Sequence, residues 1–509
     1  MTIARTIMVQ GTASSVGKSI LVTALCRILR QDGYRVAPFK AQNMSLNSFV
    51  TTEGGEIGRA QAVQAEAACI APSVYMNPIL LKPEGDAKSQ VIVSGKVWKT
   101  LEAGQYWRNR QPLLEVVQKS LDRLRTDYDV VVIEGAGSPA EINLKDQDIV
   151  NMRVAMMAGA PVLLVGDVDR GGVFAALVGT LHLLTPRERG YVKGLIVNRF
   201  RGDVSLLRPG VDKLEKMTGK PCLGVVPYLP RLGIAQEDSV YLDDRQRRKG
   251  RPDCLDIAVI WLPHISNYDD FDPLDRDDCA VRYVSAADDL GVPDVIIVPG
   301  TKTTISDLLY IRSSGLAQAI VERHRMGVAV IGICGGYQIL GKTISDPGCV
   351  ESGLREVEGL SLLDVETTFG PAKRTSQVRA RVEIGHGLLG GLEGQELEGY
   401  EIHMGSTTKN SGACAFRIVH TPGGETDYED GCVDSSGRVM GTYIHGLFNN
   451  ENFTTGLLSA LGRSKTATAR RDTRAWRDQE YDRLALAVKQ SLDMKQVYEI
   501  LATGMESTS

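Results

Sequence analysis

The chain opens with the stretch TIMVQGTASSVGKS, which runs from Thr6 to Ser19. Residues 6–10 have the apolar character of a buried strand, and residues 19–31 show the periodicity of a helix. Between them lies a loop of small residues that ends in Gly17-Lys18-Ser19. A strand, such a loop and a helix in this order form the setting of a phosphate-binding loop, because backbone N–H groups and the helix N-terminus can surround phosphate oxygens. The stretch therefore predicts a nucleotide-binding α/β domain.

Individual residues of this loop have predicted roles. Lys18 is expected to neutralise the β- and γ-phosphates of ATP, and the hydroxyl of Ser19 is expected to ligate Mg²⁺. The spacing between the two glycines of the loop is one residue longer than usual, but it is regular when counted from Thr12. The residues expected to bind the phosphates are Gly11, Thr12, Ser15, Val16, Gly17, Lys18 and Ser19.

Polar side chains at the ends of later strands extend the predicted site. Glu134 ends the apolar run VVVI, and a carboxylate at this end of a parallel strand lies where ligands bind. Glu134 is therefore predicted to hold Mg²⁺ together with Ser19. Asp167 follows another buried run and is a further candidate carboxylate. Asn198 closes the run GLIVN and is predicted to contact the nucleobase of ATP.

The pattern around the loop extends over the whole chain. Continuous Val/Ile/Leu runs at 35–39, 129–133, 161–165 and 194–198 alternate with helical patterns, which is typical of parallel strands buried on both faces. We predict a doubly wound P-loop domain over residues 1–230 and a charged linker over 231–252. A second α/β domain is expected at 253–460 and a helical C-terminal extension at 461–509. The predicted fold class is α/β in both domains.

The second α/β pattern contains a candidate nucleophile. GICGGYQ, from Gly332 to Gln338, follows an apolar run and places glycines two residues before and after Cys334. The arrangement is similar to the strand–turn–helix elbow G-x-S-x-G, in which the helix N-terminus lowers the pKa of a thiol. His445 ends a later apolar run and is followed by a glycine, so it is the predicted base. For His403, a structural role is favoured.

Composition narrows the classes of protein to consider. Lys+Arg number 58 and Asp+Glu number 62, and the formal charge of −4 argues against a nucleic-acid partner. The nine cysteines contain no CxxC pair, so no disulfide framework or zinc knuckle is expected. No apolar stretch approaches the roughly 18 residues of a membrane helix, so no membrane partner is expected. We predict a soluble, cytoplasmic protein; the sequence carries no signal of its oligomeric state.

Together the motifs resemble a known family. GICGGYQ and TYIHG (442–446) look like a class I glutamine amidotransferase domain of the cobalamin-biosynthetic type. GTASSVGKS and VIEGAG (132–137) are similar to the dethiobiotin-synthetase-like ATPase domain, and the order of the two domains matches the cobyric and cobyrinic acid amidases. Within that group, KAQNMSLN (40–47) and DRGGVF (169–174) look like the cobyric acid synthases. The resemblance covers residues 1 to about 460.

The resemblance implies an activity and a set of site residues. The implied reaction is ATP-, Mg²⁺- and glutamine-dependent amidation of adenosylcobyrinic acid a,c-diamide at carboxylates b, d, e and g, which gives adenosylcobyric acid. Cys334 would attack the glutamine carboxamide and release ammonia, with backbone donors at Gly300 and Gly335 stabilising the oxyanion. The residues it indicates as substrate contacts are Lys40, Gln42, Asn43, Asp169 and Arg170.

One position departs from the general class I pattern. Other class I enzymes carry a glutamate two residues after the catalytic histidine, whereas this chain has Leu447. The cobalamin-type enzymes resemble this chain in that respect, so a Cys–His dyad is expected. Glu401 is a possible orienting carboxylate for His445.

Other functions remain open from the sequence. A cobyrinic acid a,c-diamide synthase would perform the same chemistry at carboxylates a and c, although the QNMSLN stretch favours the first interpretation. A partitioning or regulatory P-loop ATPase usually carries an extra lysine near the start of its loop, and residues 11–16 contain none. A cysteine hydrolase with a vestigial ATP loop would turn over without ATP.

Overall fold

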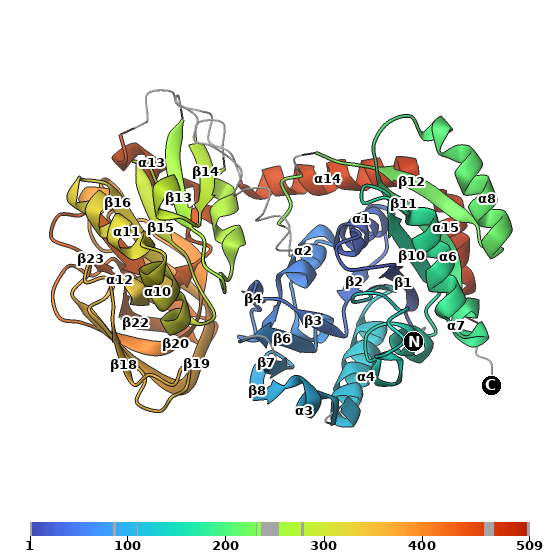
Figure 1. Cartoon of the computed structure of the whole chain (residues 1–509), viewed down its shortest axis with the longest axis horizontal. Helices are drawn as coiled ribbons and strands as arrows, with labels where there is room; N and C mark the ends of the chain where they lie inside the picture. Colours follow the sequence, from blue (N-terminus) through green and yellow to red (C-terminus); the bar gives the residue numbers. More distant parts are fainter. Residues whose placement is uncertain are drawn as a thin grey trace. The chain divides into compact units, whose positions relative to one another are not determined.

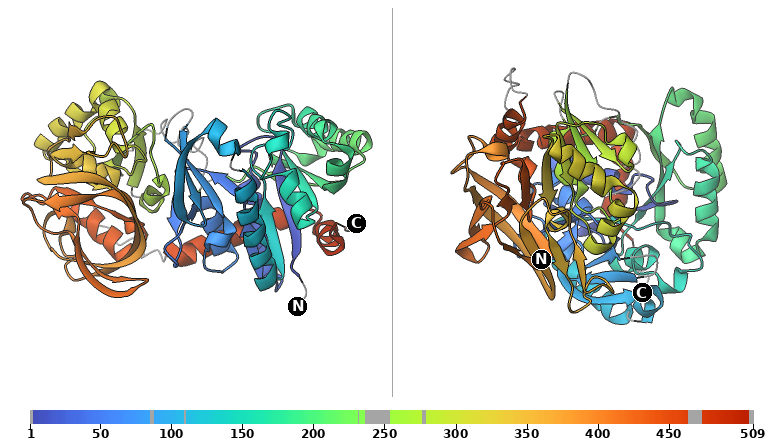
Figure 2. Two further views of the ribbon diagram at one scale, coloured as in Figure 1. Left: turned by 90° about the horizontal axis from the view of Figure 1, so that it is seen from below. Right: turned by 60° about the vertical axis from the view of Figure 1, so that its left-hand side comes forward.

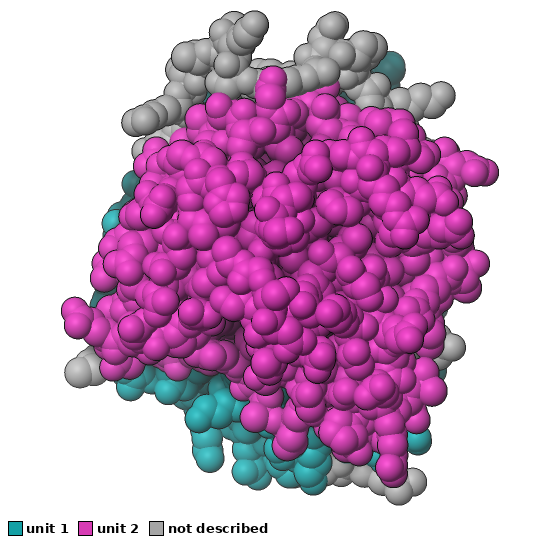
Figure 3. All heavy atoms as spheres, turned by 90° about the vertical axis from the view of Figure 1, so that its left-hand side faces the viewer, with its two compact units in different colours: residues 1–45, 56–235, 475–509 teal, residues 46–55, 236–474 magenta. Residues whose placement is uncertain are grey.

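The computed structural model describes residues 3–84, 88–108, 110–230, 232–235, 254–275, 279–462 and 473–505. The chain forms two compact units, coloured separately in Figure 3. Unit 1 comprises Met1–Ser45, Glu56–Ala235 and Ala475–Ser509, and unit 2 comprises Leu46–Gly55 and Gln236–Arg474. The boundary near residue 235 falls within the predicted linker 231–252, of which only 232–235 lie among the described residues.

Unit 1 is built on a parallel sheet with the strand order β12-β11-β10-β1-β9-β2 (Figure 1). Met8 on β1 lies in one apolar cluster with side chains of α4 and α6, whereas Ile7 and Val9 lie in another with side chains of α1. Helices thus cover both faces of the sheet, which explains its continuous apolar runs. The strands are β1 (Arg5–Gly11), β2 (Val36–Phe39), β9 (Val130–Glu134), β10 (Val162–Asp167), β11 (Val192–Phe200) and β12 (Cys222–Pro227).

The position of β1 brings the predicted nucleotide residues together. β1 pairs with β10 on one side and with β9 on the other, so the loops that follow these strands meet at one edge of the sheet. The doubly wound α/β fold predicted from the sequence is confirmed for this unit. Its helices include α1 (Lys18–Gln31), α2 (Arg59–Ala67), α4 (Arg110–Asp127), α5 (Met152–Ala158), α6 (Val173–Leu183), α7 (Pro186–Tyr191) and α8 (Arg208–Thr218).

A smaller sheet with the order β3-β6-β7-β8 also belongs to unit 1. Its strands are β3 (Gln42–Met44), β6 (Ile79–Pro83), β7 (Lys88–Val93) and β8 (Lys96–Glu102), and α3 (Ala103–Arg108) follows β8. The short strands β4 (Ser48–Val50) and β5 (Glu56–Gly58) lie between β3 and α2 in the chain. The chain passes from β2, an edge strand of the main sheet, almost directly into β3 of this smaller sheet.

The C-terminal helices α14 (Thr473–Ser491) and α15 (Met494–Thr503) are drawn in red in Figure 1. The predicted extension 461–509 is not a separate unit in the structure, because residues 475–509 are part of unit 1. Leu484 and Val488 of α14 are buried in the same apolar cluster as α1, and Arg27 pairs with Asp482 at 2.7 Å. The helices therefore complete the core of unit 1.

Unit 2 contains a sheet with the order β14-β13-β15-β16-β24-β23, in which β23 is antiparallel to β24 and the other neighbours are parallel. Helices α10 (Thr304–Ser313) and α11 (Leu316–Arg325) connect β15 to β16. The strands are β13 (Leu255–Ile260), β14 (Cys279–Val284), β15 (Val295–Val298), β16 (Ala329–Ile333), β23 (Cys432–Val433) and β24 (Val439–Thr442). The predicted α/β class is confirmed here too.

A largely antiparallel sheet forms another layer of unit 2, seen as the orange strands of Figure 2. Its long strands β19 (Val365–Val382) and β20 (Glu396–Lys409) pair with each other, and β20 also pairs with the short strand that carries His445. The other elements are β17 (Thr343–Ser345), β18 (Glu356–Glu358), β21 (Phe416–Thr421), β22 (Gly424–Asp430), β25 (Ile444–His445), α12 (Gly335–Leu340) and α13 (Glu451–Ala460). Within the described ranges, no helix is long and apolar enough to cross a membrane.

Candidate functional site

The loop between β1 and α1 is tightly curled and needs glycine at both ends. Gly17 precedes α1 with a φ of 95°, in the left-handed region that favours glycine. A Cβ on Gly17 would lie 2.1 Å from Nδ2 of Asn198, and one on Gly11 would lie 2.5 Å from Cγ2 of Val16. Ser15 also has a positive φ, of 58°. The backbone is wound so closely here that neither glycine could carry a side chain without a clash. A loop of this form can surround a phosphate group with its backbone N–H groups.

The loop motif and the motif after β9 meet in the structure. The ammonium of Lys18 donates hydrogen bonds to the carbonyl of Ala13, at 2.8 Å, and to that of Gly137, at 3.1 Å. The hydroxyl of Ser19 donates to Oε1 of Glu134 at 2.8 Å. The two residues predicted to hold Mg²⁺ therefore lie together, although they are far apart in sequence.

Glu134 is the charged centre of this site. It is fully buried, and Lys40 lies 2.8 Å from its Oε1 while Nε2 of Gln64 donates to its Oε2 at 2.5 Å. Burial alone would raise the pKa of Glu134, but the charge and hydrogen bond of Lys40, with those of Gln64 and Ser19, hold it below its usual value. An ionised carboxylate beside a hydroxyl is the oxygen donor set that Mg²⁺ prefers, so the residues fit this ion.

Strands β10 and β11 hold the loop through hydrogen bonds that involve Val165 and Asn198. Nδ2 of Asn198 donates to the carbonyl of Val16 at 2.8 Å, and the backbone N–H of Thr12 donates to the carbonyl of Val165 at 2.9 Å. Asn198 is 6% exposed. Its place in the structure therefore gives it a role in shaping the loop, while its contact with a nucleobase stays a prediction.

Three of the substrate candidates lie close together in the chain: Lys40, which contacts Glu134, and Gln42 and Asn43, which follow it. Gln42 accepts a short hydrogen bond from the hydroxyl of Tyr106, and Nδ2 of Asn43 donates to Oε1 of Gln61 at 3.1 Å. Lys40 and Asn43 are buried, whereas Gln42 is half-buried. Lys40 thus belongs to the nucleotide site itself, and the other two substrate candidates lie beside it.

The other substrate candidates occupy the loop after β10. Asp167 ends the strand and pairs with Arg199 at 3.1 Å, while Asp169 pairs with Arg201 at 2.9 Å. Asp169 and Arg170 are exposed. Because β10 lies next to β1, this loop opens at the same sheet edge as the phosphate loop.

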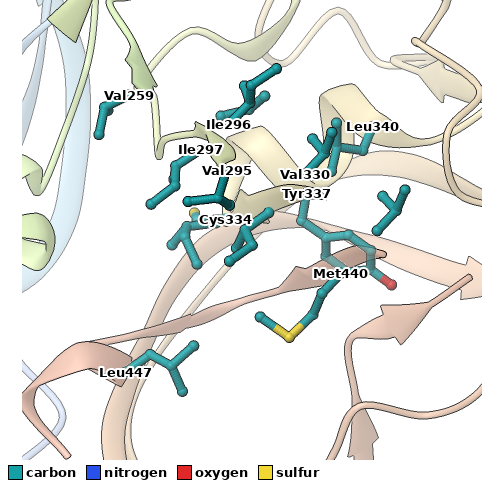
Figure 4. Packing of buried hydrophobic residues seen from close by; sticks show 14 of the residues in the cluster. Val259, Val295, Ile296, Ile297, Val330, Cys334, Tyr337, Leu340, Met440 and Leu447 are labelled. Atoms are coloured by element: carbon teal, nitrogen blue, oxygen red, sulfur yellow. The ribbon is translucent and has the colours of Figure 1, made fainter. Parts of the chain in front are cut away.

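In unit 2, Cys334 lies in a strained turn between β16 and α12. Its φ of 52° and ψ of −110° are unusual for a residue other than glycine, and such strain is typical of functional turns. A Cβ on Gly336 would lie 1.9 Å from the carbonyl of Val298, so the helix can approach β15 only with glycine there. Cys334 is buried in the same apolar cluster as Ile297 and Val330, and all three are labelled in Figure 4. The structure thus has the elbow that the spacing predicted.

The imidazole of His445 is held by a carboxylate that the sequence did not reveal. Nδ1 of His445 lies 2.6 Å from Oδ2 of Asp270, and the N–H of Gly446 donates to Oδ1 of Asp270 at 2.8 Å. Burial alone would lower the pKa of His445, but Asp270 and a hydrogen bond to Cys334 raise it well above its ordinary value. Asp270 therefore favours the imidazolium, the form that can donate a proton to a leaving group beside Cys334.

The expected Cys–His dyad is thus a triad in the structure, and Glu401 is not its third member. Oε2 of Glu401 accepts the hydroxyl of Tyr428 at 2.7 Å and pairs with Arg374 at 3.0 Å. Tyr400 is opposite His445 across β20 and β25, so the next residue along β20 points to the other face of the sheet. Asp270 comes from the short helix at Tyr268–Leu274, after β13.

His403 is placed as a structural residue. Its Nδ1 lies 3.2 Å from the carbonyl of Gly405, and its ring stacks on that of Tyr443 with the centroids 3.7 Å apart. Burial lowers the pKa of His403 to about 3, although the hydrogen bond to Gly405 opposes this. A ring that stays neutral at physiological pH and stacks in this way serves packing.

The two candidate oxyanion donors lie close to Cys334 and His445. A Cβ on Gly300 would lie 3.1 Å from Cε1 of His445, and Gly335 is the first residue of α12, directly after Cys334. The first N–H groups of a helix have no acceptor within it and are available to an anion. Their action on an oxyanion stays a prediction that this geometry allows.

Asp270→Asn is expected to lower glutaminase turnover by about 10²–10⁴-fold, the range of positioned acid–base catalysis. Without the carboxylate, burial dominates and the pKa of His445 falls, so the imidazolium is lost at a lower pH. The basic limb of the pH profile of glutaminase kcat/KM should therefore move to lower pH. Glu401→Gln is the matched control, because it neutralises another buried carboxylate of unit 2 and should leave the profile in place. Equal loss in the two variants would contradict the role of Asp270.

The fold and the sites define a glutamine amidotransferase domain joined to a nucleotide-binding domain. Residues 256–453 match the family model of the CobB/CobQ-like glutamine amidotransferase domain, and residues 7–240 match the CobQ/CobB/MinD/ParA nucleotide binding domain. The chain is 57% identical to the cobyric acid synthase of Dehalococcoides mccartyi strain 195, over 99% of each chain. It is 55% identical to that of Sorangium cellulosum, over 96% of this chain and 97% of the relative. The chain therefore belongs to the cobyric acid synthase family, and the family predicted from its motifs is confirmed.

Proposed function

We propose that the protein uses ATP and glutamine to amidate carboxylates b, d, e and g of adenosylcobyrinic acid a,c-diamide, giving adenosylcobyric acid in cobalamin biosynthesis. The observation that carries the proposal is the presence in one chain of the Cys334–His445–Asp270 triad and of a phosphate loop joined to Glu134. Membership of the family supplies the corrinoid substrate. The reaction is proposed to occur in the cytoplasm, where the thiol of Cys334 stays reduced.

The triad performs the glutaminase half of the reaction. The thiolate of Cys334 attacks the carboxamide carbon of glutamine, and the N–H groups of Gly300 and Gly335 stabilise the oxyanion. The imidazolium of His445 then protonates the departing nitrogen, which leaves as ammonia and gives a glutamyl thioester. His445, now neutral, takes a proton from water, whose oxygen attacks the thioester; glutamate is released, and the Cys334 thiolate and the His445 imidazolium are restored. Asp270 keeps the ring oriented through both steps.

The nucleotide site performs the amidation half. A substrate carboxylate oxygen attacks the γ-phosphorus of ATP and ADP leaves, which gives an acyl phosphate. Ammonia then attacks the acyl carbon, and inorganic phosphate leaves with the C–O bond electrons. Lys18 stabilises the charge on the transferring phosphoryl group. Ser19 and Glu134 would hold Mg²⁺, which neutralises phosphate charge when it is bound.

Mass spectrometry of corrinoids tests this assignment. The enzyme is incubated with ATP, Mg²⁺ and glutamine, and with either the a,c-diamide or the unamidated cobyrinic acid. We expect amidation of the diamide and no product when ATP is omitted. Amidation of the unamidated acid at carboxylates a and c would instead identify an a,c-diamide synthase. Glutamine hydrolysis without any corrinoid product would contradict the proposal.

His445→Ala is expected to lower glutaminase turnover by about 10²–10⁴-fold while ammonia-dependent amidation stays near wild type, because the base acts only on the glutamine side. Leu447, at the position where other class I enzymes carry glutamate, is 1% exposed and lies in the apolar core (Figure 4). Leu447→Ala is therefore expected to cost about 2–5 kcal/mol of stability. Its glutaminase rate, normalised to folded protein, should exceed that of His445→Ala. A His445→Ala enzyme with wild-type glutaminase would move the base elsewhere.

A further inference from the structure

A short stretch early in the chain belongs to unit 2 rather than to the unit around it. Residues Leu46–Gly55, called segment 46–55 below, lie with unit 2, whereas Met1–Ser45 and Glu56–Ala235 on either side of the segment lie with unit 1. The sequence motif that ends at Asn47 was the basis for the predicted substrate contacts. The motif is therefore divided between the two units: residues 40–45 belong to unit 1, and residues 46–47 belong to unit 2.

Segment 46–55 is bound to the turn that leads to Asp270. The N–H of Ser48 donates to Oδ1 of Asn267 at 3.0 Å, and the N–H of Tyr268 donates to Oδ1 of Asn47 at 3.3 Å. Asn47, Ser48 and Asn267 are buried, and Asn267 has a φ of 52°. Buried hydrogen bonds of this kind are costly to break, so the segment fixes the start of the helix that carries Asp270.

The same segment also contacts the residue that stacks on His445. The ring of Tyr400 is parallel to that of His445, at 17° with the centroids 5.3 Å apart. The ring of Phe49 packs against that of Tyr400, with their centroids 5.8 Å apart. The hydroxyl of Tyr400 also donates to the carbonyl of Ser48 at 3.5 Å. The orientation of the catalytic imidazole thus depends on a ring that the segment holds.

Val50 extends this contact to the nucleophile. Its side chain is fully buried and forms an apolar cluster with Tyr400 and Ile402. The carbonyl of Ile402 accepts the thiol of Cys334 at 3.5 Å. The segment therefore packs on Tyr400, which stacks on His445, and on Ile402, whose carbonyl accepts the thiol of Cys334.

We propose that Val50 and Phe49 are positioning residues through which the amidation domain controls the glutaminase triad. The chain that enters the segment comes from Lys40, which is paired with Glu134 at the nucleotide site. Binding of ATP and corrinoid in unit 1 is therefore transmitted along a short stretch of backbone to the supports of His445 and Cys334. This inference rests on the proposed function, because it assigns corrinoid and ATP to unit 1.

The test is the stimulation of glutaminase by the other substrates. Glutaminase kcat and KM are measured for the wild type and for Val50→Ala, without and with ATP, Mg²⁺ and the a,c-diamide. We expect the wild-type kcat to rise by about 5- to 150-fold, the usual range of coupling between sites. In Val50→Ala this rise in glutaminase kcat should disappear, while the KM for glutamine stays as in the wild type. Ammonia-dependent amidation should continue in this variant.

Two further variants separate positioning from folding. Phe49→Leu keeps the apolar volume of a half-buried residue but removes its ring from Tyr400, so it should fold and still lose stimulation. Val382→Ala makes the same truncation in another buried valine of unit 2 and should keep stimulation. Full stimulation in Val50→Ala or Phe49→Leu, or none in the wild type, would overturn the inference alone. Absence of ammonia-dependent amidation in the wild type would count against the proposed function itself.

Discussion

Cys334→Ala is expected to abolish glutamine-dependent amidation while ammonia-dependent amidation continues close to the wild-type rate. Cys334 supplies the sulfur atom of the thioester. Removing a catalytic nucleophile typically lowers kcat by a factor on the order of 10⁶. The nucleotide site lies in the other unit and keeps its Lys18, Ser19 and Glu134 contacts. Corrinoid products are measured by mass spectrometry with glutamine or ammonium as the nitrogen source.

The matched control for this variant is Cys279→Ala. Cys279 is another buried cysteine of unit 2, on β14, so its replacement by alanine makes the same change in volume away from the elbow. Glutamine use should be retained in Cys279→Ala. Loss of both nitrogen sources in a folded Cys334→Ala protein would show that the two reactions do not have separate sites.

Lys18→Ala is expected to block amidation from either nitrogen source. Lys18 is the cation of the phosphate loop, and loss of one such electrostatic stabiliser costs about 10²–10³-fold in rate. Without activated carboxylate, ammonia has no acyl phosphate to attack, whichever way it is supplied. Unstimulated glutaminase activity should persist, because the triad is formed by residues of unit 2.

Lys145→Ala tests whether a change of charge in unit 1 is enough to cause this loss. Lys145 pairs with Glu188 at 2.6 Å and is remote in sequence from the phosphate loop. Amidation with ammonium should be near wild type in Lys145→Ala. Near-normal ammonia-dependent amidation in Lys18→Ala would remove Lys18 from the phosphate site.

Features that depend on neighbouring residues could be predicted from the sequence. The phosphate loop is a strand, a glycine-bounded turn and a helix in succession, and the elbow at Cys334 is the same kind of local pattern. The apolar runs were enough to predict parallel strands, and parallel order placed Glu134 at the edge where Ser19 begins its helix. His445 was found because a glycine follows it at a strand end.

Features that depend on tertiary packing could not be predicted in this way. Asp270 is 175 residues from His445 and lies in an acidic run, so no local signal separates it from solvent-exposed carboxylates. Glu401 was a possible orienting carboxylate for His445, but the alternation of side chains along β20 turns it away. The helical character of the C-terminal residues could be predicted from their spacing. Their packing on α1 could not, because it depends on the fit between side chains far apart in sequence.

Segment 46–55 illustrates the same limit within one motif. The run from Lys40 to Asn47 reads as a single substrate-contact stretch, because a sequence does not show where a chain passes from one compact unit to another. The hydrogen bonds of Asn47 and Ser48 to the turn before Asp270, and the burial of Val50 against Tyr400 and Ile402, reveal that the later residues support the glutaminase site.

In the proposed reaction, the nitrogen released at Cys334 is the nitrogen that the ATP-dependent site builds into the corrinoid. This transfer is measured by the mass of the corrinoid product formed from the a,c-diamide, ATP, Mg²⁺ and glutamine labelled with ¹⁵N in its amide. We expect ¹⁵N in every newly formed amide of the wild-type product, and none in product made by Cys334→Ala with unlabelled ammonium and the same labelled glutamine. Unlabelled amides in the wild-type product, or labelled amides from Cys334→Ala, would contradict this transfer.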